Sequence, residues 1–88
     1  MRGGLTQSAV LKRSIVLKGH KTSVTLEEPF WIGLREIARE KGFTMGGLVA
    51  QIDAERTGSN LSSALRVYVL EYYKAIHEKR AGPQPGDA

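Results

Sequence analysis

The chain has 88 residues, enough for one domain with a small core, and it contains no cysteine, which excludes disulfide bonds and thiolate metal sites. Its formal net charge of +4 is unevenly divided: residues 1–26 hold five basic and no acidic residues, whereas residues 27–88 hold eight basic and nine acidic residues. This asymmetry indicates an anionic partner for the N-terminal segment, with nucleic acid favoured over a membrane, or else a solvated basic arm.

The first element expected is a strand over about 20–26. Its side chains alternate between two sides, with Lys21, Ser23 and Thr25 on one and Val24 and Leu26 on the other. Upstream, Ile15 and Leu17 alternate in the opposite phase, and Gly19-His20 lies between the two runs. Such a phase change requires a bulge or a turn. The pattern fits a hairpin within the chain, turning at residues 18–21, or a single kinked strand that pairs with another chain.

Three helices follow, over about 28–41, 45–56 and 60–78. Glu28-Pro29 suits the first turn of a helix, and Gly42 ends that helix. Thr44 is a good N-cap for the second helix, and Asn60 or Ser59 for the third. Two glycines, at 46 and 47, stand in the first turn of the second helix, where they indicate close approach of another group to the backbone.

No catalytic or metal-binding constellation is present. The two histidines, His20 and His77, are far apart in the sequence and lack the spacing of metal ligands. Asp53 and Glu55 are two apart on a helix and face different directions, so they do not form an acid/base pair. We therefore expect neither an enzyme nor a cofactor.

The start of the chain lacks the apolar run of a secretory signal, and the run at 67–70 is too short to span a bilayer. We expect a cytoplasmic protein without a membrane partner. The expected organisation is a flexible basic arm over 1–11, one domain over 12–79 and a disordered tail over 80–88.

The stretch KTSVTLEEPFWIGLREIAREKGFTMGGLVAQI, from Lys21 to Ile52, resembles the ribbon-helix-helix superfamily of bacterial DNA-binding proteins, typified by the Arc and MetJ repressors. The resemblance continues through NLSSALRVYVLEYY, at residues 60–73, to a subgroup of short bacterial members. It implies a mainly α fold with one short strand, in which two intertwined chains share an intermolecular two-stranded antiparallel ribbon and carry an additional C-terminal helix. The ribbon would enter the DNA major groove.

Carried onto this sequence, the resemblance assigns three roles. The base-contacting residues would be Lys21, Ser23 and Thr25. The phosphate contacts would come from the start of the second helix and from the arm: Thr44, Met45, Gly46, Gly47, Arg13, Lys18 and His20. The dimer core would hold Val24, Leu26, Phe30, Leu34, Ile37, Leu48, Val49 and Ile52.

The sequence thus predicts a homodimeric, nucleoid-associated transcriptional regulator, for instance a repressor, that binds double-stranded DNA without a cofactor. The alternative is an antitoxin or another protein-interaction module whose C-terminal helix binds a partner protein. That helix could also enlarge the dimer or make a tetramer.

Overall fold

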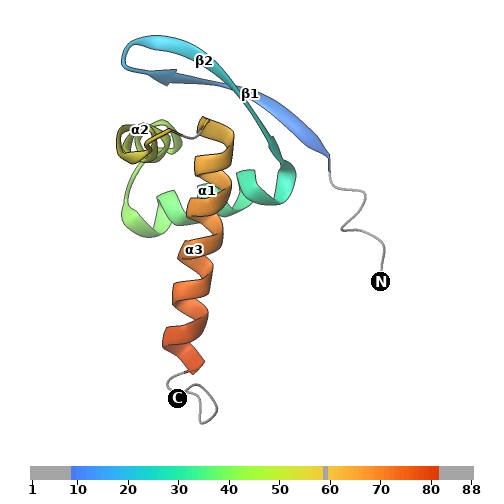
Figure 1. Cartoon of the computed structure of the whole chain (residues 1–88), viewed down its shortest axis with the longest axis vertical. Helices are drawn as coiled ribbons and strands as arrows, with labels where there is room; N and C mark the ends of the chain where they lie inside the picture. Colours follow the sequence, from blue (N-terminus) through green and yellow to red (C-terminus); the bar gives the residue numbers. More distant parts are fainter. Residues whose placement is uncertain (1–8, 59, 82–88) are drawn as a thin grey trace.

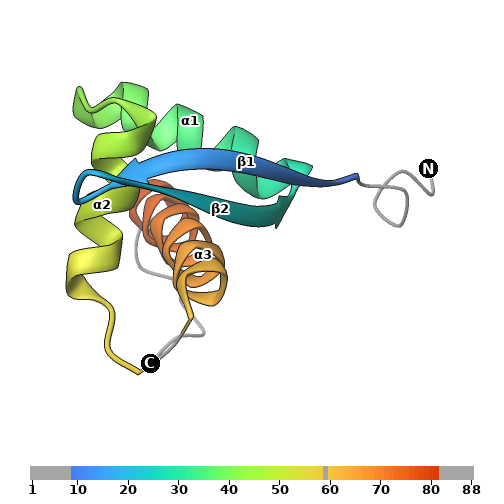
Figure 2. The ribbon, with the colours of Figure 1, turned by 90° about the horizontal axis from the view of Figure 1, so that it is seen from above.

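The computed structural model describes residues 9–58 and 60–81. The described elements are two strands followed by three helices: β1 (Val10–Leu17), β2 (His20–Glu27), α1 (Glu28–Lys41), α2 (Met45–Glu55) and α3 (Leu61–Ala81). The strands form a ribbon across one side of the helices, and α3 leads away from the ribbon (Figure 1). Seen from above, the closed end of the ribbon crosses α2 (Figure 2). The fold is mainly helical with a β-hairpin.

The ends of the chain are only partly described. β1 begins at Val10, so Val10 and Leu11 belong to the hairpin and not to the expected arm. At the other end α3 extends to Ala81, into the range expected as a tail. The remaining parts of the expected arm and tail, residues 1–8 and 82–88, lie outside the described residues.

The ribbon is formed within one chain, so the expectation of an intermolecular ribbon is wrong. β1 pairs antiparallel with β2, from Val10 opposite Glu27 to Leu17 opposite His20. The connection is Lys18-Gly19, with φ of 52° and 80°, the paired positive values of a type I′ turn. In this register an odd-numbered residue of β1 always faces an even-numbered residue of β2. This register explains the phase change in the sequence, because it places Ile15 and Leu17 of β1 on the same side of the ribbon as Val24 and Leu26 of β2.

The hydrophobic core closes within a single chain. Apolar side chains on the inner side of the ribbon pack against all three helices, and no polar side chain is buried in the described part of the chain. Thirteen hydrophobic residues are buried: Ile15, Leu17, Val24, Leu26, Trp31, Leu34, Ile37, Ala38, Leu48, Val49, Ile52, Leu65 and Val69. They include every residue expected in a dimer core except Phe30, which is partly buried against the same cluster. These residues thus have packing partners without a second copy.

Local interactions fix the helix ends that position the ribbon and α2. Gly42 adopts φ of 75° after α1, and the Phe43 N–H donates to the Ala38 carbonyl at 2.8 Å, which together end the helix sharply. Thr44 and Asn60 cap α2 and α3 by accepting from the N–H groups of Gly47 and Ser63, at 2.9 and 2.8 Å. The sequence predicted the cap at Thr44 and gave Asn60 as one of two candidates for α3.

Two glycines should respond to alanine with opposite signs. Gly19→Ala places a Cβ in the left-handed region, so we expect a loss of about 1–2 kcal/mol of unfolding free energy. Gly46 has ordinary helical geometry, and a Cβ added there would meet open space, so Gly46→Ala should stabilise the helix by up to about 1 kcal/mol. Urea denaturation of both variants measures this difference. Equal stability of Gly19→Ala and the parent would contradict the turn.

Candidate nucleic-acid interface

The outer side of the hairpin is an exposed polar surface with contributions from both strands. Its paired residues are Lys12 opposite Thr25, Ser14 opposite Ser23 and Val16 opposite Lys21, because directly opposed residues of an antiparallel pair point to the same side. We call these six residues the ribbon face. All six are exposed, and Val16 keeps 60% of its surface accessible although it is apolar. Three of them, Lys21, Ser23 and Thr25, were assigned to base contacts from the sequence.

Positive charge is concentrated on the hairpin. Between Val10 and Leu26 the basic residues are Lys12, Arg13, Lys18 and Lys21, and there is no acidic residue. None of these four forms an ion pair within the described part of the chain. The next residue, Glu27, is an acid, but it is engaged by Arg66. The hairpin therefore presents four basic side chains whose charge no described acid offsets by direct contact.

Arg13 lies beside the ribbon face and not on it. It belongs to the inner phase of β1, yet its side chain is exposed, and its guanidinium carbon lies 5.5 Å from the centroid of the Trp31 ring. Trp31 is buried and its Nε1–H donates to the Leu11 carbonyl at 3.0 Å. The ring thus fastens α1 to β1 and orients the guanidinium by a cation–π contact. This leaves Arg13 exposed at the flank of the ribbon.

Two contacts hold the end of β2 against α3. Arg66 donates to both Glu27 carboxylate oxygens, from Nε at 2.9 Å and from Nη2 at 3.4 Å. The Ser62 hydroxyl donates to the Thr25 carbonyl at 3.1 Å. The hydrogen bond from Arg66, aided by a backbone hydrogen bond, lowers the pKa of Glu27 below its ordinary value. The open end of the ribbon is therefore tied to α3 through both a side chain and the backbone.

The other residues expected at phosphates lie in two places. Lys18 and His20 are exposed at the closed end of the hairpin, on either side of Gly19. Thr44, Met45, Gly46 and Gly47 stand at the start of α2, on a separate element next to the end of α1 (Figure 2). At that helix start, the Gly47 and Leu48 N–H groups are already bonded to Thr44. The geometry of a helix terminus leaves the N–H groups of Met45 and Gly46 available.

Sequence reasoning missed the contribution of β1 to the ribbon face. Lys12, Ser14 and Val16 were not assigned to it, because Arg13 interrupts the apolar alternation of β1 and obscures the strand. The signal that could have found them is the odd phase of Ile15 and Leu17. If this segment is taken as one strand of a hairpin, that phase places the even-numbered residues of β1 on the outer side of the ribbon.

Comparison with known proteins identifies the family. The family model described as ribbon-helix-helix domain matches residues 10–73. The chain belongs to the ribbon-helix-helix family. Proteins with this domain are typically DNA-binding regulators or antitoxins and are generally not enzymes.

A solved structure also resembles the chain. An uncharacterized protein from Bordetella pertussis Tohama I is 34% identical, with a TM-score of 0.75, and the match covers 98% of this chain and 70% of that one. No curated protein matches. In residues 9–58 and 60–81, no helix has the length and apolarity needed to cross a membrane.

The Glu27–Arg66 pair predicts a small acid-sensitive contribution to stability. Because folding lowers the pKa of Glu27 from 4.5, the contribution is complete above about pH 4.5 and is lost as the pH falls through the folded-state pKa. As the pH is lowered from about 5 to 3, the thermal midpoint should therefore fall less steeply in Arg66→Met than in the parent. Glu55→Gln, an exposed acid on α2, is the matched control that should leave this fall unchanged. An identical fall in Arg66→Met and the parent would exclude this role.

Proposed function

We propose that this ribbon-helix-helix protein is a transcriptional regulator that binds duplex DNA by inserting its hairpin into the major groove. The observation that supports this most is the ribbon face, an exposed polar surface on a hairpin with four basic residues and no acid before Glu27. A two-stranded ribbon fits the major groove, where each base pair has a distinct pattern of donors and acceptors. Bound at an operator, the protein would act sterically, by blocking or recruiting polymerase.

The ribbon face has the chemistry of moderate base readout. Lys12 and Lys21 can donate to guanine O6 or N7, and the hydroxyls of Ser14, Ser23 and Thr25 can donate or accept. Val16 is apolar, and its methyl groups suit the methyl group of thymine. Short hydroxyl side chains discriminate between bases less sharply than bidentate arginine or asparagine. We therefore expect the ribbon face to prefer some DNA sequences over others, mainly through its two lysines and one apolar contact.

Phosphate contacts would then set the position of the ribbon. Arg13 at one flank and Lys18 and His20 at the closed end suit the two sides of the groove. The free N–H groups of Met45 and Gly46 add an anion site at the positive end of the α2 dipole, and Gly46 leaves the approach open.

We further propose that the protein acts as a homodimer. Because each chain forms its own ribbon, a dimer would present two ribbons and bind two half-sites. The alternative function, an antitoxin, would instead use α3 to hold a partner protein, and Val67 and Leu70 of that helix are exposed apolar residues that suit such a contact.

Single lysine variants test the ribbon. Lys12→Ala and Lys21→Ala should each weaken binding to a selected duplex, whereas Lys79→Ala removes the same charge from α3 and should have little effect. The target comes from selection in a random duplex pool, and affinity is measured by fluorescence anisotropy over a salt series. A lysine that contacts phosphate should reduce the log–log salt slope by about 0.9, and one that contacts a base should instead reduce discrimination. Equal losses in all three variants, or no binding at low salt, would refute the ribbon interface.

The anion site at α2 is tested by a change that separates folding from binding. Gly46→Glu adds a negative charge at a helix N-terminus, where it should leave the folded state as stable as the parent or slightly more so. The same charge should repel a phosphate and weaken DNA binding severalfold. Gly46→Gln is the control of equal size without charge. Unchanged DNA affinity in Gly46→Glu would show that this helix start does not meet DNA.

A further inference from the structure

The two strands of the hairpin carry the same pattern of residues. β1 has the sequence KRSIVL from Lys12 to Leu17, and β2 has KTSVTL from Lys21 to Leu26. Lysine, serine and leucine recur at the same three places, and an inward isoleucine of β1 corresponds to an inward valine of β2. Because the strands are antiparallel, this repeat gives the ribbon an approximate two-fold axis, which passes through the central pair of Ser14 and Ser23.

The symmetry puts one lysine and one β-branched residue at each end of the ribbon face. Lys12 lies opposite Thr25 toward the open end, and Lys21 lies opposite Val16 toward the closed end. Directly opposed side chains have Cβ atoms about 4.5–5.5 Å apart, so each lysine and its partner can reach neighbouring bases. The two ends are about 13 Å apart along the strands, which corresponds to about four base-pair steps of B-DNA.

Val16 is the position at which the two ends differ. The symmetry relates it to Thr25, whose side chain has nearly the same shape but carries a hydroxyl in place of one methyl group. Val16 can neither donate nor accept a hydrogen bond, and it keeps 60% of its surface exposed although the other five residues of the ribbon face are polar. In the major groove, thymine displays an apolar group, its C5-methyl, and 5-methylcytosine displays the same group. Val16 thus complements a methylated pyrimidine.

We propose that Val16 is a specificity-determining residue, which selects a pyrimidine with a 5-methyl group beside the guanine contacted by Lys21. The inference rests on the proposed function, because it assigns the base preference at the closed end of the ribbon face. At that end the lysine donates to guanine O6 or N7, and Val16 supplies a contact that depends on the methyl group alone. Thymine and 5-methylcytosine are equivalent for this contact, so DNA binding should respond to cytosine methylation.

Removal of single methyl groups from the DNA tests this inference. In a duplex selected from a random pool, each thymine is replaced in turn by deoxyuridine, which lacks the methyl group and keeps every hydrogen-bonding group. For the parent, one replacement should weaken binding about three- to fivefold, the effect of losing one buried methyl group. Replacing the neighbouring G·C pair by A·T should weaken binding by the parent more than binding by Lys21→Ala. Equal effects in both proteins would contradict the pairing of Val16 with Lys21.

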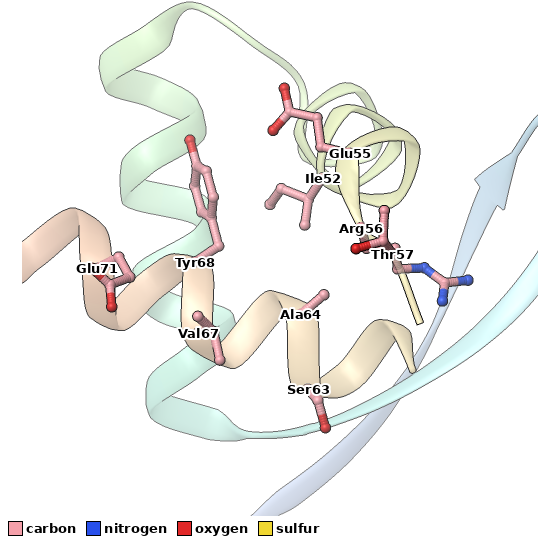
Figure 3. Close-up of a pocket in the computed structure, with 9 residues that line it drawn as sticks. All are labelled: Ile52, Glu55, Arg56, Thr57, Ser63, Ala64, Val67, Tyr68 and Glu71. Carbon is pink, nitrogen blue, oxygen red and sulfur yellow. The ribbon is translucent and has the colours of Figure 1, made fainter. Parts of the chain in front are cut away.

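A valine-to-serine change assigns the methyl contact to one residue. Val16→Ser removes both methyl groups at an exposed position, so the hairpin should still form, and duplexes with thymine and with deoxyuridine should bind equally well. Val67→Ser is the matched control and should keep the full methyl effect, since Val67 is 56% exposed and lies on α3, where it lines a pocket beside the end of α2 (Figure 3).

Cytosine and 5-methylcytosine, placed in turn at the sensitive position, measure the same contact a second time. Methylation of that cytosine should strengthen binding by the parent by the same factor that separates thymine from deoxyuridine. It should leave binding by Val16→Ser unchanged. A methyl effect seen with thymine but absent with cytosine would contradict a contact that depends on the methyl group alone.

The outcomes separate this inference from the proposed function. If the parent binds duplex DNA and no thymine is sensitive to loss of its methyl group, the inference is wrong and the proposed function stands. A methyl effect of the same size in Val16→Ser, when circular dichroism shows the variant folded, assigns the contact to another residue and also overturns the inference. If the parent binds no duplex even at low salt, the proposed function fails and the inference fails with it.

Discussion

The two-residue turn at Lys18-Gly19 is the constraint on which the rest of the structure depends. Positive φ at both positions gives the chain reversal a twist that matches the two strands, so β2 finds its partner directly upstream in the same chain. The inner side of the closed hairpin packs against the three helices that follow it in the chain. The ribbon face and the single-chain core both depend on that local reversal.

Trp31 converts this local hairpin into tertiary structure. It is buried in α1, it donates to the Leu11 carbonyl, and Arg13 lies over its ring. At the same open end of the ribbon, Arg66 and Ser62 of α3 hold Glu27 and the Thr25 backbone of β2. The ribbon is therefore supported at β1 by α1 and at β2 by α3. Support from two elements holds the open end of the ribbon in place, which suits the proposed role of its outer side in DNA binding.

Local pattern predicted the parts of the fold that depend on periodicity and caps. The alternation in β2 gave the correct sides for Lys21, Ser23, Val24 and Leu26, and Thr44 was identified as a cap. The sequence left two partners open for β2, the preceding strand of the same chain or a second chain, and the structure has the first. The pattern did not decide between them, because lysine is unusual at the first position of a type I′ turn, where asparagine or glycine is the common signal. Contacts between residues distant in the sequence, such as Arg13 with Trp31, are not visible in residue spacing, so the position of Arg13 beside the ribbon face was not predictable.

A ribbon completed within one chain changes what dimerisation contributes. When two chains share one ribbon, the second copy is needed to build the DNA-binding surface itself. When each chain carries its own ribbon, the second copy adds a second surface, and its benefit is the raised effective concentration of that surface near DNA. DNA binding would then depend on protein concentration, because only a dimer could occupy two suitably spaced half-sites at once. A single chain would bind one half-site weakly.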